Sequence, residues 1–158
     1  MSGWIVLLLA GSLTTGGTPM ECERVVNPDG RSLEAIEETF HAWREAVETG
    51  DLDAVVGLVT EDAEFWSPEQ PPLVGRDAVR EAFSAALERW RWDQAFECRE
   101  LIVAGGYALV RGVEVNRLEP RGGGDATVRR QRAFSVLREG EDGAWRFARG
   151  MTNAPPEG

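Results

Sequence analysis

Lysine is missing from this chain of 158 residues, which also has one histidine and two cysteines. All 17 basic residues are therefore arginines, so catalysis through a Schiff-base lysine is excluded. A buried cation must be a guanidinium group or His41, which lies on a predicted helix. Histidine, cysteine and acidic residues are not clustered at ligand spacing, so we expect no metal site and no cofactor.

The two cysteines, Cys22 and Cys98, are too few for a disulfide framework and too far apart for a metal site. Cys22 lies in an irregular N-terminal stretch, and Cys98 lies in a predicted strand. We expect each to be a lone thiol. A bridge between them in an oxidising compartment is the alternative.

Positive charge is also scarce, since 27 acidic residues give a formal net charge of -10. Such a chain repels phosphate backbones and anionic lipid surfaces, which argues against binding to nucleic acid. The 42% of hydrophobic residues suffice for one core, and a chain of this length forms one domain.

One long apolar run, Trp4 to Ala10, is too short for the roughly 20 residues of a membrane span, so we expect no stable membrane insertion. It resembles the core of a signal peptide but lacks a preceding basic residue. The chain is therefore either secreted, or cytoplasmic with its start at Met20, which is slightly favoured. We place residues 1–30 outside the fold as an irregular or signal-like leader.

Three helices are predicted in the first part of the chain. The first has its N-cap at Ser32 and an apolar stripe at helical spacing. Gly50 ends it in a left-handed conformation, and Asp51 caps a short second helix. The third helix runs from Arg76 to about Arg91, after a proline-rich segment.

Period-two patterns predict strands in the rest of the chain. Extended structure is expected at Ala63 to Trp66, and four longer strands at 94–103, 108–118, 127–138 and 145–153. Asp142-Gly143 is a strong hairpin signal. Helices followed by an antiparallel meander predict the α+β class.

Four segments carry a family resemblance: WREAVETGD (43–51), LVTEDAEF (58–65), PPLVGRDAVREAF (71–83) and DGAWRFARGMTN (142–153). In this order and spacing they resemble the NTF2-like superfamily, in its SnoaL-like and ketosteroid-isomerase-like branch. The resemblance covers residues 32 to 156, so we assign 31–158 to one domain. It implies a cone-shaped fold with three N-terminal helices on a curved, mainly antiparallel sheet, an internal pocket, and a homodimer formed through the sheet.

The residues that ketosteroid isomerases use are absent. The resemblance places Ser67 where those enzymes have an aspartate base and Trp43 where they have a tyrosine. It also implies a buried aspartate on the penultimate strand, but no Asp or Glu lies between Ala126 and Arg138. Steroid isomerisation of that kind and aldol-type cyclisation are therefore not expected.

A carboxylate that reaches the pocket from another strand would again favour an enzyme. If the strand parity is shifted by one residue, Glu64, Glu97 or Glu114 reaches the pocket.

The catalytic candidates are Ser67, Arg149 and Asn153. Arg149 is at least as well explained by a surface salt bridge. Arg111 and Arg132 share parity with apolar residues, and each needs an acceptor, either a carboxylate across the sheet or a ligand oxygen. The predicted pocket lining is Phe40, Trp43, Phe65, Ser67, Trp90, Arg111, Val113, Arg132, Phe134, Arg149, Met151 and Asn153.

Such a lining suits a flat, apolar molecule that carries oxygen. We expect a domain that binds a small apolar, oxygen-bearing molecule. The alternative is a small enzyme of the isomerase, cyclase or hydratase/lyase type, acting on an aromatic or polyketide-like carbonyl compound. The sequence leaves open whether the chain is an enzyme.

Overall fold

The computed structural model describes residues 20–68 and 70–155, and one seven-stranded sheet organises them. The helices are α1 (Gly30–Thr49), α2 (Leu52–Gly57) and α3 (Gly75–Arg89). The strands are β1 (Arg24–Val26), β2 (Val59–Trp66), β3 (Leu73–Val74), β4 (Trp90–Ala104), β5 (Tyr107–Pro120), β6 (Thr127–Glu139) and β7 (Trp145–Asn153).

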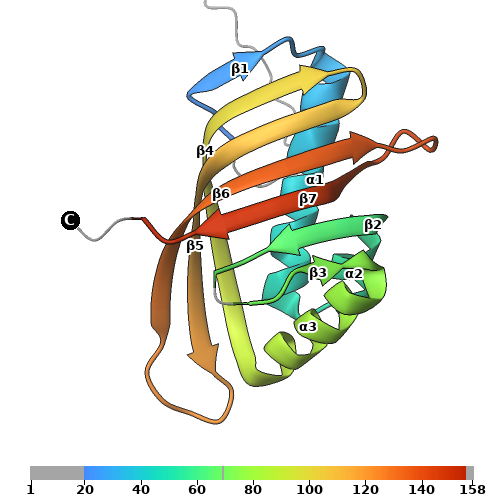
Figure 1. Ribbon diagram of the computed structural model, residues 1–158. Helices are drawn as coiled ribbons and strands as arrows, with labels where there is room; N and C mark the ends of the chain where they lie inside the picture. The colour runs from blue at the N-terminus through green and yellow to red at the C-terminus, as the bar shows by residue number, and fades with distance from the viewer. Residues whose placement is uncertain (1–19, 69, 156–158) are drawn as a thin grey trace, which may run out of the picture.

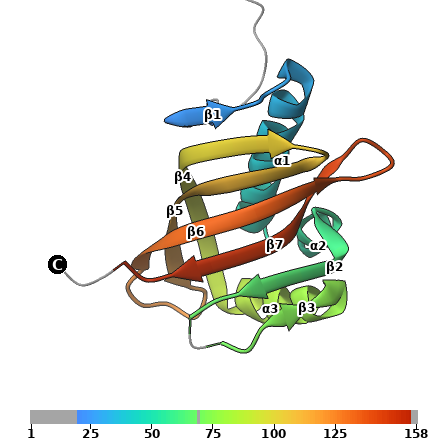
Figure 2. The ribbon, with the colours of Figure 1, turned by 45° about the horizontal axis from the view of Figure 1, so that its top comes forward.

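The strand order is β1-β4-β5-β6-β7-β2-β3. Neighbours from β4 to β7 are antiparallel, whereas β1 is parallel to β4 and β2 is parallel to β7. The sheet curves, and α1 crosses behind the strands in the view of Figure 1; a tilted view shows the same arrangement (Figure 2). The predicted α+β fold, with helices on a mainly antiparallel sheet, is confirmed.

The helix ends follow from capping side chains. Asp29, and not the predicted Ser32, is the N-cap of α1: its carboxylate accepts hydrogen bonds from the backbone N–H of Ser32 (2.7 Å) and from the Ser32 hydroxyl (2.8 Å). Gly50 ends α1 at φ 73°, as predicted. Asp51 caps α2 through the N–H of Ala54 at 3.0 Å, also as predicted.

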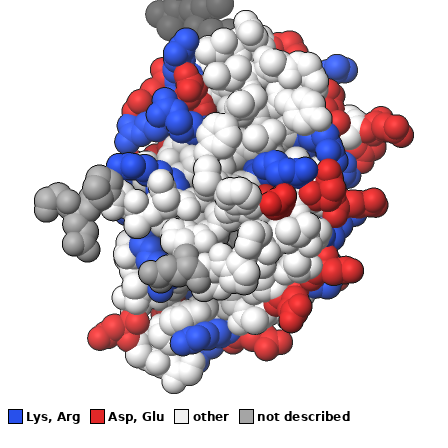
Figure 3. Space-filling view, viewed as in Figure 1, with Lys and Arg blue, Asp and Glu red and all other residues white. Residues whose placement is uncertain are grey.

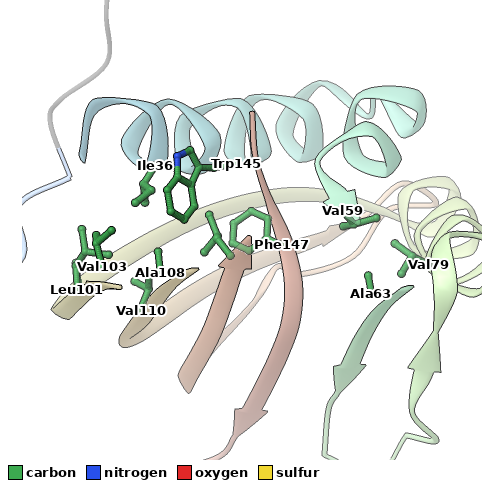
Figure 4. Close-up of a cluster of buried hydrophobic side chains, with 12 residues drawn as sticks. Ile36, Val59, Ala63, Val79, Leu101, Val103, Ala108, Val110, Trp145 and Phe147 are labelled. Carbon is green, nitrogen blue, oxygen red and sulfur yellow. The ribbon is translucent and has the colours of Figure 1, made fainter. Parts of the chain in front are cut away.

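The core lies between α1, α3 and the facing side of the sheet. Figure 4 shows Ile36 of α1 beside Trp145 of β7, and Val79 of α3 beside Ala63 of β2. These side chains are at most 3% exposed. Burial of side chains of this size, at roughly 25 cal/mol per Å² of apolar area, is the main stabilising contribution to the fold.

β-bulges interrupt the β4–β5 and β6–β7 ladders, and the pairing of β2 with β7 also shifts register between Val59 and Glu64. Arg99 has no partner where β4 shifts register against β5, and Ala148 has none where β7 shifts against β6. One extra residue moves every later side chain to the other face of the sheet. This shift is invisible to a strict period-two pattern, and the bulge at Ala148 explains the wrong faces predicted for Arg149 and Asn153.

The N-terminal boundary and the cysteine prediction need correction. Residues 24–26, placed outside the fold by the sequence, form β1 and pair with β4. Cys22 and Cys98 are not lone thiols, because a disulfide joins them. An ion pair between Arg24 and Glu100 (3.2 Å) holds the same segment.

The apolar run Trp4 to Ala10 lies outside the described residues. Within the described residues, no helix is both long and apolar enough to cross a membrane.

Candidate functional site

A cavity of about 690 Å³ opens between the helices and the concave side of the sheet. Its wall has an aromatic part, contributed by α1, α3, β4 and β7. These residues are Phe40, Trp43, Phe83, Trp92, Phe96 and Phe147.

The aromatic rings hold one another in place. The ring of Phe40 lies 5.0 Å from that of Phe96 and 5.1 Å from that of Phe147. Phe83 lies edge-on to Trp43 at 5.3 Å and stacks on Trp92 at 5.5 Å. Aromatic pairs at such distances stabilise each other beyond simple burial, so this wall is preformed for a flat apolar ligand.

Polar side chains line the sheet side of the cavity. Glu114 and Asn116 of β5 share a face, and their neighbours across the ladders include Gln131 of β6 and Gln94 of β4. Ser135 and Thr152 also line the cavity. The site therefore combines an apolar wall with a polar floor that holds a carboxyl group.

A directed chain of hydrogen bonds ends at this carboxyl group. The Nε1–H of Trp43 donates to Oε1 of Gln94 (2.9 Å), and Nε2 of Gln94 donates to Oδ1 of Asn116 (2.8 Å). Trp92 Nε1–H donates to the same Asn116 oxygen at 2.8 Å. Nδ2 of Asn116 then donates to Oε1 of Glu114 at 2.9 Å.

Burial raises the pKa of the Glu114 carboxyl above its ordinary value, and the hydrogen bond from Asn116 opposes part of this rise. A carboxyl group of this kind takes up and releases a proton closer to neutral pH than an exposed one, which suits a general acid or base. Within the described residues, no three His, Cys, Asp or Glu side chains are grouped to hold a metal ion.

Four predicted pocket residues line this cavity alone: Phe40, Trp43, Phe65 and Ser67. Met151 borders it too, but it pairs with Phe134 and also lines a depression on the opposite face of the sheet. Within the described part of the chain, the Ser67 hydroxyl makes no hydrogen bond that would activate it as a base.

Trp90 does not line the cavity. It lies at the far end of β4, opposite Pro120, and the Arg89 guanidinium sits 4.9 Å from its ring. The predicted helix end at about Arg91 was late, since α3 stops at Arg89. The first cavity-lining tryptophan of β4 is therefore Trp92.

The predicted parity of the middle strands is wrong. Even-numbered residues of β5 and odd-numbered residues of β6 face the cavity, as Glu114 and Gln131 do. The side chains on the opposite face line a second, shallower depression of about 510 Å³. They include the predicted pocket residues Arg111, Val113, Arg132, Phe134 and Asn153. The guanidinium of Arg111 lies 3.5 Å from the Glu100 carboxylate of β4. A carboxylate across the sheet was one of the two kinds of acceptor predicted for Arg111.

Arg149 was placed toward the cavity because it shares parity with Trp145 and Phe147. The bulge at Ala148 turns it to the opposite face. There its Nη1 donates to the backbone oxygen of Asp62 (2.8 Å), and its Nη2 lies 3.6 Å from the Asp62 carboxylate. Hydrogen bonding from Arg138 keeps the pKa of that carboxyl far below its usual range. Arg149 is thus held in a surface ion-pair group, the alternative that the sequence left open.

Of the three carboxylates that a shifted parity would bring to the pocket, Glu114 lines the cavity. Glu97 instead pairs with Arg130 at 3.0 Å, and Glu64 accepts a hydrogen bond from Trp66 at 2.6 Å. Sequence reasoning missed the partners of Glu114, namely Trp92, Gln94, Asn116 and Gln131. The sequence does contain a signal, because polar Glu114 and Asn116 alternate with apolar Val113 and Val115 along β5. This alternation identifies the polar residues of the cavity only when the face of β5 that lines the cavity is known.

Comparison with known proteins gives the following similarities. Residues 40–149 match the family of the SnoaL-like domain. No curated protein matches the chain.

Solved structures resemble the chain over most of its length. A ketosteroid isomerase-like protein from Erwinia carotovora atroseptica is 25% identical over 82% of this chain and 100% of its own, with a TM-score of 0.71. An NTF2-like superfamily protein from Salmonella enterica serovar Typhimurium is 14% identical over 78% and 91%, with a TM-score of 0.70. An NTF2-like protein with a cystatin-like fold from Novosphingobium aromaticivorans is 20% identical over 79% and 82%, with a TM-score of 0.66.

Proposed function

The chain belongs to the SnoaL-like domain family of the NTF2-like superfamily, and from this premise we propose that it is an enzyme whose Glu114 exchanges a proton with a small, flat, oxygen-bearing molecule. The observation that carries the proposal is the Glu114 carboxyl, which lies on the cavity floor with one oxygen fixed by Asn116. The name of the Erwinia relative, ketosteroid isomerase-like, agrees with proton-transfer chemistry.

The cavity suits a carbonyl compound with a ring system. Aromatic walls on α1, α3 and β4 flank a flat ring, and the buried floor supplies polar groups for its oxygen. Protonated Glu114 donates a hydrogen bond to the carbonyl oxygen; ionised Glu114 accepts a proton from the adjacent carbon. Isomerisation and elimination of water both begin with such a transfer.

A non-catalytic ligand-binding domain is the second candidate. It is favoured by Ser67 and Trp43, which stand where ketosteroid isomerases carry their base and tyrosine. The indole N–H of Trp43 is also engaged by Gln94 and is not free for a ligand.

The test is exchange of carbon-bound hydrogen in D₂O. Native mass spectrometry of the purified protein, and thermal-shift measurements with aromatic and polycyclic ketones, first identify compounds that bind. Each binder is then incubated in D₂O with the wild-type protein or with Glu114→Gln, and deuterium uptake is followed by mass spectrometry. We expect the wild-type protein to catalyse exchange and the variant to be slower by about 10²–10⁴-fold.

Glu97→Gln is the control, because it makes the same change on the neighbouring strand β4, at a carboxylate outside the cavity. Equal exchange by wild-type protein and Glu114→Gln contradicts the role of Glu114. Tight binding with no exchange by either protein supports the non-catalytic candidate. No binding of any compound overturns both.

A further inference from the structure

The two oxygens of the Glu114 carboxyl are not equivalent. Oε1 accepts the hydrogen bond from Asn116, and no hydrogen bond from a described residue reaches Oε2. Glu114 lines the cavity, and Oε2 is the oxygen of its carboxyl that the hydrogen bonds of the described residues leave to that cavity.

This difference depends on how the Asn116 amide is oriented. An amide can present either its oxygen or its NH₂ to a carboxyl group, and only the NH₂ stabilises the ionised form. Asn116 is 4% exposed, so little of its amide is open to solvent. Its neighbours therefore decide the orientation.

Those neighbours include two indoles, and an indole N–H can only donate. Trp92 donates to Oδ1 of Asn116, which leaves the NH₂ of that amide for Glu114. Trp43 donates to Oε1 of Gln94, which directs the Gln94 NH₂ to the same Asn116 oxygen. Both indoles thus impose one orientation on the chain of amides.

We propose that Trp43 and Trp92 are positioning residues that decide which oxygen of Glu114 reacts. They assign Oε1 to the protein and Oε2 to the ligand, so the exchangeable proton resides on Oε2. The inference rests on the proposed function, because it states which oxygen of the Glu114 carboxyl exchanges a proton with the ligand.

The test is a titration of Glu114 by ¹³C NMR, with the side-chain carboxyl signal assigned through Glu114→Gln. Trp92→Phe and Trp43→Phe keep an aromatic ring and remove the indole N–H. Loss of either donor lets the Asn116 amide turn its oxygen toward Glu114, which disfavours the carboxylate. We expect Glu114 to titrate at higher pH in both variants, and at still higher pH in the double variant.

Trp90→Phe is the matched control. It lies on the same strand, outside the cavity, and its indole makes no hydrogen bond within the described residues. We expect Glu114 to titrate as in the wild-type protein. If an indole variant does not fold, Gln94→Met replaces it, since this change interrupts the chain of donors and keeps a side chain of similar size.

Folded indole variants in which Glu114 titrates as in wild-type protein overturn the inference. An equal shift in Trp90→Phe also overturns it, because that result indicates a general effect of losing a tryptophan. The titration needs no ligand, so its failure is distinct from failure of the exchange test with Glu114→Gln.

Discussion

Glu114 lies where a neutral side chain would be more stable. Its pKa is raised by burial, so the folded state binds the proton more tightly than the unfolded chain does. Ionisation of Glu114 therefore destabilises the fold as the pH rises from the unfolded pKa, near 4.5, through the higher folded one. This opposition between stability and function is common at active sites.

We accordingly expect Glu114→Gln to be more stable than the wild-type protein at pH 7. Glutamine keeps the oxygen that accepts from Asn116 and carries no charge. The difference should vanish below the unfolded pKa, where Glu114 is protonated in both states. Urea unfolding at pH 7 and near pH 4 measures it, and a variant that is less stable at pH 7 contradicts the raised pKa.

The sequence predicts which aromatic residues belong to the pocket better than it predicts the face of the sheet on which a strand residue lies. Phe40, Trp43 and Phe65 were predicted to line the pocket from helical spacing or from a short strand, and they line the cavity. Arg111 and Arg132 were assigned to the wrong face, since both faces of their strands carry apolar residues and the pattern does not say which is inside. The sequence points to Glu114 only if the alternation of side chains on β5 is shifted by one residue from the predicted one.

At the scale of elements, β1 is fastened to the sheet in three ways: the disulfide between Cys22 and Cys98, the Arg24–Glu100 ion pair and parallel pairing with β4. Met20 and Glu21, immediately before Cys22, line the cavity. The disulfide therefore also holds part of the cavity wall. Because disulfides persist mainly in oxidising compartments, we propose that the chain resides in one.

Replacement of both cysteines by serine should lower the free energy of unfolding by up to about 4 kcal/mol, because a bridge across a separation of 76 residues restricts the unfolded chain strongly. Urea unfolding of the double variant measures the loss. Wild-type protein treated with a reducing agent should show a similar decrease. Unchanged stability in both contradicts a structural role for the bridge.

Gly150 of β7 lies opposite Phe65 of β2, and both line the cavity. A Cβ atom at Gly150 would lie 2.5 Å from the Phe65 ring. Gly150→Val should thus displace that ring, narrow the cavity and destabilise the protein by about 1–3 kcal/mol.

Thermal unfolding and ligand binding measure these two effects. Gly122→Ala is the control, because a Cβ there meets no atom within 4 Å. A Gly150→Val protein with wild-type stability and binding would mean that Phe65 moves freely.

The elements themselves were largely predictable. Helical spacing, Gly50 and Asp51 located the first two helices, and the strand 145–153 has the predicted ends. Bulges were not predictable, since nothing in the side chains of Arg99 or Ala148 marks them as extra. They arise from how neighbouring strands pair, which is set by contacts distant in sequence.

At the scale of the whole molecule, the outer face of the sheet carries exposed apolar side chains. Phe134 is 38% and Met151 50% exposed. Figure 3 views the molecule from this side and shows uncharged side chains over much of the face, between groups of charged ones. We propose that two copies pair through this face, as the family resemblance led us to expect.

Phe134→Arg should then convert a dimer into a monomer, since it adds charge to an apolar contact. Light scattering after size-exclusion chromatography measures the mass. Val74→Arg is the control, because Val74 is exposed on the edge strand β3, three strands away from β6. A monomeric wild-type protein contradicts the proposal.

The disulfide also divides the chain into two parts that respond differently to a pulling force. Residues 23–97 lie within the loop that the bond closes, and they include α1 to α3 and β1 to β3 of the described chain. Tension applied between the two ends of the chain passes from Cys22 directly to Cys98 and bypasses this loop. While the bond is intact, the backbone that carries Phe40, Trp43 and Phe83 is not stretched directly along the chain, and the covalent tension falls on the segment from the end of β4 to β7.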